Sequence, residues 1–158
     1  MAESGLLVVD TIERQRGKIA FLLRAAGYRV DVADGFEHAR ERIARCEPSC
    51  IVTGVRLGLY NGLHLIARAR RLHPSMASVL THNFADPVLQ SEARSSDTAF
   101  LVLPCPGEVL VNLVRHSILR ASKSSGQSFS QRKVGSGEDS NEPAAPGRFT
   151  LNTDPPAV

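Results

Sequence analysis

The sequence lacks tryptophan and contains only two tyrosines and six phenylalanines in 158 residues. Proteins that bind single-stranded nucleic acid without sequence preference stack bases on aromatic side chains, so this scarcity argues against that class. No apolar run approaches the roughly 18 residues that a membrane-spanning helix needs. The first residues, MAESGLLVVD, lack the basic flank of a secretory signal. We therefore expect a cytoplasmic protein that does not associate with a membrane.

Metal-binding patterns are absent as well. The three cysteines, Cys46, Cys50 and Cys105, and the five scattered histidines do not form the paired spacings of a zinc site. An odd number of cysteines in a protein expected to be cytoplasmic indicates free thiols. The formal net charge of +3 is a mild excess that only weakly favours an acidic partner. We expect neither a metal ion nor a cofactor.

The sequence does contain enough apolar residues for one core. Hydrophobic residues make up 42% of the chain, and a mass of 17.1 kDa suits one domain. The composition changes once, near Ser122. Residues 122–158 are rich in Ser, Gly and Pro, and their few large apolar side chains cannot offset the entropy lost on ordering. We predict a folded domain over residues 1–121 and a disordered tail over 122–158.

Five short apolar runs in the first part of the chain predict β-strands. They cover residues 6–10, 28–33, 50–53, 77–81 and 99–103. Four of them are apolar nearly throughout, which is typical of strands buried on both faces of a parallel sheet. The second run, YRVDVA, alternates between polar and apolar residues and is expected at or near an edge of the sheet.

Apolar residues three and four positions apart predict five helices, each following one strand. They cover residues 12–26, 36–46, 62–72, 86–94 and 106 to about 118. Gly27 is a natural C-terminal cap, and Asn61 and Asp86 are natural N-terminal caps. This strict alternation predicts an α/β fold of three layers, a flavodoxin-like (βα)5 domain with a five-stranded parallel sheet. Ligands of such sheets bind beyond the carboxyl ends of the strands.

Four segments at these strand ends carry a resemblance to a known family. LLVVD, SCIVTGVRLGLYNG, SVLTH and FLVLP resemble, in order and approximate spacing, the receiver domain of two-component response regulators. The likeness extends over about residues 5 to 120. It implies a receiver fold and a signalling role in a two-component phosphorelay. A histidine kinase or a downstream regulator would then be the partner.

The residues that perform receiver chemistry are changed in this sequence. In the family, an Asp at the end of the third strand accepts a phosphoryl group. That Asp and an acidic pair after the first strand hold Mg²⁺, and a Ser/Thr and a Lys contact the phosphoryl group. Asp10 matches the first acid, and Thr81 matches the hydroxyl. Thr11, Gly54 and Leu103 stand where the second acid, the acceptor and the lysine would be. We call these five positions the altered acceptor site.

These changes predict a pseudo-receiver, a domain with the receiver fold that is not phosphorylated by the family's route. Acyl-phosphate formation needs a carboxylate nucleophile, and Gly54 has no side chain. A single acid, Asp10, would bind Mg²⁺ poorly. The sequence also contains no nucleophile elbow and no glycine loop for phosphate after the first strand, so we do not expect an enzyme. The expected mode of action is protein–protein contact.

The resemblance implies an output face formed by the fourth helix, the fifth strand and the fifth helix. Phe100 and Arg94 fall on this face, and Phe100 matches the family's aromatic switch position. Phe100 could anchor a partner, or it could turn inward and pack. Thr81 likewise has two interpretations, as the switch hydroxyl or as an ordinary residue at a strand end. The latter is favoured because no phosphoryl group is expected.

Two other functions remain open from the sequence. A phosphate-responsive receiver would use a non-standard acceptor, either Asp10 or the hydroxyls of Thr11 and Thr53. A nucleic-acid or scaffold protein would use the arginines of two neighbouring helices, namely Arg40, Arg42, Arg45, Arg68, Arg70 and Arg71. Nucleic-acid binding is the weaker of these, because no known DNA-binding module accompanies the receiver-like segments. A homodimer is also compatible with the sequence.

Overall fold

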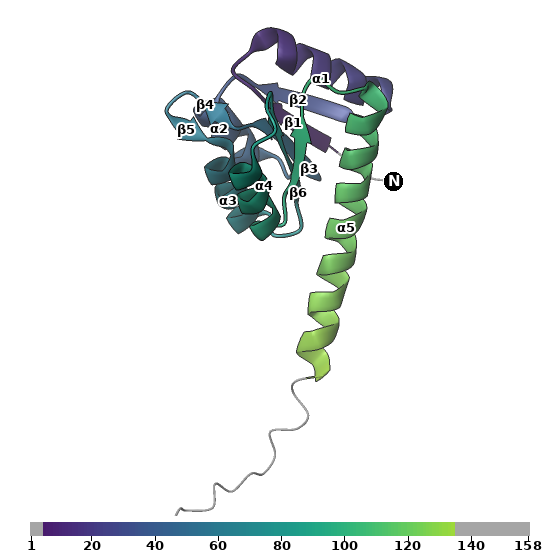
Figure 1. Ribbon diagram of the computed structural model, residues 1–158. Helices are drawn as coiled ribbons and strands as arrows, with labels where there is room; N and C mark the ends of the chain where they lie inside the picture. The colour runs from purple at the N-terminus through teal and green to yellow at the C-terminus, as the bar shows by residue number, and fades with distance from the viewer. Residues whose placement is uncertain (1–4, 135–158) are drawn as a thin grey trace, which may run out of the picture. The chain divides into compact units, whose positions relative to one another are not determined.

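The computed structural model describes residues 5–134, with side chains described as far as residue 124 (Figure 1). Five parallel strands form the central sheet in the order β2-β1-β3-β6-β7. The strands are β1 (Gly5–Val9), β2 (Arg29–Ala33), β3 (Cys50–Gly54), β6 (Ala77–His82) and β7 (Ala99–Val102). The alternating strand β2 lies at an edge, as predicted. The predicted fold class, a five-stranded parallel sheet in an α/β domain, is confirmed.

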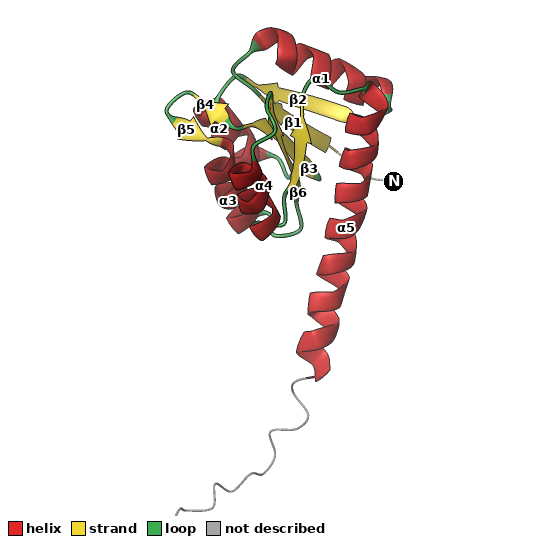
Figure 2. Ribbon diagram, viewed as in Figure 1, coloured by secondary structure: helices red, strands yellow, loops and turns green. Residues whose placement is uncertain are grey.

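Helices cover both faces of the sheet and complete three layers (Figure 2). The helices are α1 (Glu13–Ala25), α2 (Phe36–Arg45), α3 (Gly62–Leu72), α4 (Pro87–Ser95) and α5 (Gly107–Val134). Buried residues of α2, α3 and α4 form one apolar core against the sheet, and those of α1 and α5 form a second core on the opposite face. Within residues 5–134, no helix is long and apolar enough to cross a bilayer.

The predicted caps explain where three of the helices begin or end. The Asn61 side chain accepts a hydrogen bond from the backbone N–H of Leu63 at 2.8 Å. The Asp86 carboxylate caps α4 in the same way, because it accepts from the two amides that open the helix, at 3.0 and 3.2 Å. Gly27 follows α1 with a φ of 97°, a left-handed conformation that glycine adopts without steric cost. All three cap predictions are confirmed.

A short hairpin after β3 was not anticipated from the sequence. It consists of β4 (Arg56–Leu57) and β5 (Tyr60–Asn61), which pair antiparallel. Each strand has only two residues, too few for a periodic pattern to reveal. The hairpin is fixed on α2, because the ring of Tyr60 stacks on that of Phe36 with a centroid distance of 4.2 Å.

The last helix extends beyond the predicted domain boundary. We expected it to reach about residue 118 and the tail to begin at Ser122, whereas α5 continues to Val134. Propagating an existing helix adds one hydrogen bond for each residue fixed, without a new nucleation cost. A polar sequence can therefore extend a helix that packing has already started. The remainder of the predicted tail, residues 135–158, lies outside the described residues.

Candidate functional site

The altered acceptor site lies at the carboxyl ends of four strands that are neighbours in the sheet. Asp10 follows β1, Gly54 ends β3, Thr81 lies in β6, and Leu103 follows β7. The register pairs Gly54 with Thr81. A Cβ atom built on Gly54 would stand 3.4 Å from Oδ2 of Asp10. The fold thus brings these three residues together, while Thr11 is exposed to solvent.

The carboxylate of Asp10 is buried, and each of its oxygens accepts a hydrogen bond. Asp10 is only 4% exposed. Oδ1 accepts a hydrogen bond from the Ile12 backbone N–H at 2.8 Å, and Oδ2 accepts one from Nε2 of Gln15 at 2.6 Å. The Asp10 carbonyl accepts a third hydrogen bond, from Nη1 of Arg16 at 2.9 Å. Donors from the start of α1 therefore occupy both carboxylate oxygens.

Gln15 and Arg16 are site residues that sequence reasoning missed. They lie five and six positions after Asp10, on the first turns of α1, within the run DTIERQR. Their spacing places them one helical turn or more beyond the strand end, within reach of Asp10. No motif marks them, because glutamine and arginine on a first turn are ordinary surface residues in most helices.

Gly54 lies between Asp10 and the start of α3. Space for a side chain exists on the Asp10 side, where the nearest atom to an added Cβ lies at an ordinary contact distance of 3.4 Å. On the other side, a Cβ built on Gly62 would stand 2.1 Å from the carbonyl oxygen of Gly54. The N–H of Gly62 also donates to the carbonyl of Val55 at 2.7 Å. The first residue of α3 is therefore in direct contact with the site's backbone.

The two threonine hydroxyls beside Gly54 bond to the backbone. Thr81 is 1% exposed, and its Oγ1 donates to the carbonyl of Thr53 at 3.3 Å. Thr53 is completely buried, and its Oγ1 donates to the carbonyl of Gly54 at 3.1 Å. These contacts support the interpretation of Thr81 as a packing residue at a strand end. They also leave Thr53 inaccessible as a phosphoacceptor.

Leu103 packs where a receiver would present its lysine. It belongs to the apolar core under α1 and α5, and its N–H donates to the carbonyl of His82 at 2.8 Å. Cys105, two residues later, is partly buried against the same core. Desolvation raises the pKa of the Cys105 thiol, although Lys18 and a backbone hydrogen bond act in the opposite direction. A raised pKa means less thiolate, and hence less redox reactivity.

No metal site is found among the described residues, where no three His, Cys, Asp or Glu side chains lie close enough to hold an ion. A cation bound to Asp10 would have to compete with Gln15 for Oδ2. Asp10 alone does not supply the oxygen ligands that Mg²⁺ requires. The donor set present does not fit the magnesium ion of a receiver.

The predicted output-face residues differ in exposure. Arg94 on α4 is exposed, whereas Phe100 on β7 is partly buried and packs against the core with Leu63 and Leu89. Phe100 is therefore not an exposed anchor in this structure. Exposed apolar side chains occur on both helices of that face, with Val88 on α4 67% exposed and Leu119 on α5 55% exposed, and also on the hairpin, where Leu59 is 99% exposed.

The arginines of α2 and α3 do not form a single exposed stripe of free positive charges. Nη2 of Arg40 pairs with Oε2 of Glu37 at 2.8 Å. Arg70 is half-buried and donates hydrogen bonds to Ser78 and to the carbonyl of Asp97. Two of the six arginines expected to form a positive stripe are thus engaged within the fold, which weakens the case for a nucleic-acid surface.

Comparison with known proteins gives no matching family model. The transcriptional regulatory protein FixJ of Azorhizobium caulinodans is 27% identical over 129 residues, which are 81% of this chain and 61% of that protein. The chain therefore spans about three-fifths of the length of this curated relative.

Solved structures with similar folds include a receiver domain protein and other response regulators. A response regulator receiver domain protein (CheY-like) from Methanospirillum hungatei gives a TM-score of 0.72 at 17% identity, covering 78% of this chain and 99% of that one. The chemotaxis protein CheY4 of Vibrio cholerae gives 0.68 at 18% identity, covering 73% and 99%. NtrX from Brucella abortus gives 0.73 at 18% identity, covering 80% of this chain and 29% of that one. The chain thus carries a receiver-like domain with the fold of response regulators.

Proposed function

We propose that this chain is a signalling protein of two-component circuitry that acts through protein–protein contacts and is not phosphorylated by the receiver route. One observation supports this most strongly. At the acceptor position stands Gly54, and the neighbouring carboxylate, Asp10, has both oxygens engaged by Ile12 and Gln15. The acceptor position therefore has no side-chain nucleophile, and the neighbouring carboxylate is engaged in hydrogen bonds.

The remaining oxygen groups at the site are poor substitutes for the missing acceptor. Phosphoryl transfer needs the attacking oxygen in line with the leaving group, and small displacements lower the rate strongly. Asp10 would have to break its hydrogen bond to Gln15 before attack. Thr53 is fully buried, and its hydroxyl donates to a backbone carbonyl. A non-standard acceptor is accordingly disfavoured.

The proposed partners follow from the fold. FixJ is named a transcriptional regulatory protein, and this chain matches about three-fifths of it. We expect the receiver-like domain to bind a histidine kinase or a downstream regulator in the cytoplasm, where its thiols stay reduced. A homodimer is compatible with the same role. The domain would then act as a fixed binding module.

A phosphate mimic tests the proposal directly. The full chain, labelled with ¹⁵N, is titrated with beryllofluoride and Mg²⁺ while amide NMR shifts are recorded. We expect no saturable shifts at Gly54 or Thr81, and a conventional receiver domain under the same conditions provides the positive control. Saturable shifts at these amides would overturn the proposal. So would a mass increase of one phosphate, labile to hydroxylamine, after incubation with a small phosphodonor.

A further inference from the structure

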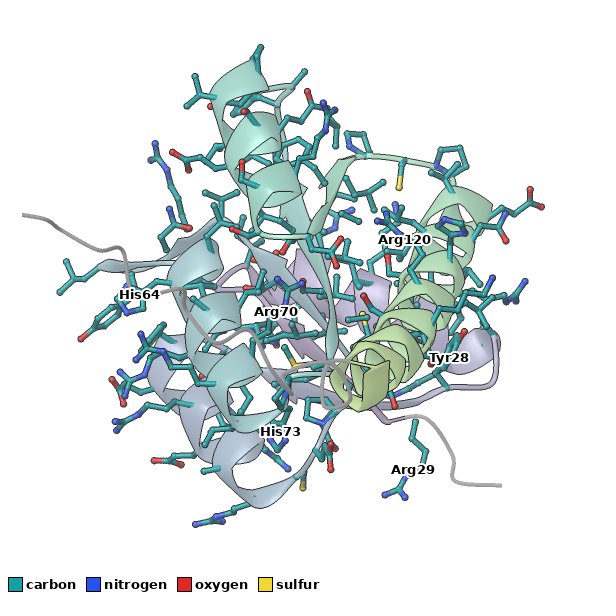
Figure 3. The ribbon with its side chains drawn as sticks, turned by 90° about the horizontal axis from the view of Figure 1, so that it is seen from below. Tyr28, Arg29, His64, Arg70, His73 and Arg120 are labelled. Atoms are coloured by element: carbon teal, nitrogen blue, oxygen red, sulfur yellow. The ribbon has the colours of Figure 1, made fainter. Side chains whose placement is uncertain are left out.

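Arg70 makes an unusual set of contacts for a residue in the last turn of a surface helix. Nη2 donates to Oγ of Ser78 at 2.6 Å and to the carbonyl of Asp97 at 2.7 Å, and Nη1 donates to the carbonyl of Ser96. The guanidinium thus reaches from α3 to the end of α4 and to β6 (Figure 3). One side chain connects three elements of the fold.

Two of these contacts cap a second helix. The final carbonyls of an α-helix have no partner within the helix and carry partial negative charge. α4 ends at Ser95, and backbone amides of the following turn bond its carbonyls at Glu92, Ala93 and Arg94. Arg70 donates to the carbonyl of the C-cap residue, Ser96, and to that of Asp97 just beyond it. A planar guanidinium suits this role because it presents several donors at fixed angles. Burial lowers the pKa of Arg70, and the charge of Asp97 opposes that shift.

The turn between α4 and β7 is closed by two backbone hydrogen bonds, from Asp97 to Arg94 and from Thr98 to Ala93, and Arg70 adds contacts to it from a neighbouring helix. Asp97 has a φ of 50°, in the left-handed region that residues with a side chain seldom adopt. The N–H of Thr98 donates to the carbonyl of Ala93 at 2.8 Å, and Oγ1 of Thr98 lies 2.9 Å from Oγ of Ser78. Ser78 and Thr98 are both buried, so Arg70 completes a buried polar network.

α3 connects this turn to the altered acceptor site. Its first residue, Gly62, is in contact with the carbonyl of Gly54, and its last turn carries Arg70. The turn itself joins α4, which carries Arg94, to β7, which carries Phe100. The third element of the output face, α5, also contacts this turn: Nη2 of Arg120 forms a salt bridge with Oδ1 of Asp97 at 3.3 Å. Both partners of that pair are exposed, so it contributes little.

We propose that Arg70 is a positioning residue, which caps α4 from α3 and thereby holds the α4–β7–α5 face in one arrangement. The inference deepens the proposed function and rests on it, because it takes the output face to receive no phosphoryl signal. A face that receives no phosphoryl signal would be held by contacts within the fold, and Arg70 joins the α4–β7 turn to α3, beside the hydrogen bond by which Thr98 joins it to Ser78 of β6.

Hydrogen exchange measured on the full chain tests the role of Arg70. Arg70→Lys keeps the positive charge but cannot donate to three oxygens at fixed angles. We expect the protected amides of Asp97 and Thr98 to exchange about tenfold faster, as loss of a charge-assisted hydrogen bond implies. Amides of the central strands, such as Val52, should keep their rates. Arg68→Lys, an exposed change two residues earlier on the same helix, should alter neither.

A second variant separates Arg70 from the exposed ion pair. Asp97→Gly keeps the carbonyl that Arg70 contacts, relieves the left-handed backbone and removes the pair with Arg120. We expect Thr98 to remain protected in this variant. Equal loss of protection in Asp97→Gly and Arg70→Lys would overturn the proposal.

The NMR shifts of amides on the output face distinguish a positioning residue from a residue that only stabilises the fold. We expect the amides of Arg94 and Phe100 to shift or broaden in Arg70→Lys and to stay unchanged in Arg68→Lys. Uniformly faster exchange across all strands, with unchanged shifts on the face, would refute the positioning role. Beryllofluoride shifts at Gly54 would overturn the proposed function and leave these exchange results as they are, so the two failures are distinguishable.

Discussion

Replacing Gly54 by aspartate places a carboxylate at the position that matches a receiver's acceptor. The variant tests whether the altered acceptor site can accommodate a second carboxylate beside Asp10. The added Cβ would stand 3.4 Å from Oδ2 of Asp10, so the structure tolerates the first atom of the side chain. The new carboxylate, however, would share a buried space with that of Asp10, which is 4% exposed. No cation among the described site residues contacts the Asp10 side chain, which accepts hydrogen bonds from an amide side chain and a backbone N–H.

The magnitude follows from Coulomb's law. Two like charges about 4 Å apart repel by about 4 kcal/mol at an effective dielectric constant of about 20. Reorientation of the new side chain toward solvent reduces this, so we expect the free energy of unfolding to fall by about 2–4 kcal/mol at pH 7. A domain of this size has only about 5–15 kcal/mol in total, so the loss is readily measured.

Urea unfolding followed by circular dichroism measures the effect, and Gly54→Asn is the matched control because it adds nearly the same volume without charge. Repulsion raises the pKa of the introduced carboxyl in the folded state above its unfolded value of about 3.9. The destabilisation is therefore present at neutral pH and disappears as pH falls toward about 4. Equal losses for the Asp and Asn variants, or a loss independent of pH, would refute the electrostatic reasoning.

Three further predictions concern two glycines and the cysteines. Gly62→Ala should lower the free energy of unfolding by about 3 kcal/mol or abolish folding, because its Cβ would stand 2.1 Å from the carbonyl oxygen of Gly54. Gly17→Ala on α1, where nothing lies within 4 Å, should raise that free energy by up to about 1 kcal/mol in the same urea assay. Burial raises the pKa of the Cys50 thiol to about 12, so iodoacetamide at pH 8 should modify exposed Cys46 and spare Cys50 in the folded protein. Mass spectrometry of tryptic peptides distinguishes the sites, and equal labelling of the two cysteines would contradict the burial of Cys50.

The sequence alone predicted the fold because its signals are local. Apolar runs separated by helical periodicity gave five strands and five helices, and side chains at Asn61 and Asp86 marked helix starts that the structure confirms. The composition of residues 122–134 was a weaker guide. Those residues are helical where a disordered tail was expected, because the extension of an existing helix depends on its start as well as on local composition.

The sequence alone could predict which chemical groups are missing from the site, but not the hydrogen bonds that its remaining groups make. The absence of an acceptor at Gly54 can be read directly from the sequence, because no arrangement of the chain gives glycine a nucleophile. The partners of Asp10 could not be read in this way. Gln15 becomes a site residue only when the turn into α1 brings its amide to 2.6 Å from a buried carboxylate.

The sequence by itself therefore determined the order of the elements and the lack of a side chain at Gly54, since both depend on residue identity and near neighbours along the chain. Only the tertiary structure decided that Thr81 bonds to a backbone carbonyl and that Phe100 packs inward. It also decided that the half-buried Arg70 donates to the backbone just after α4. These choices depend on contacts between residues far apart in the chain. Arg70 and Asp97 are 27 positions apart and meet only because α3 and α4 pack on the same face of the sheet.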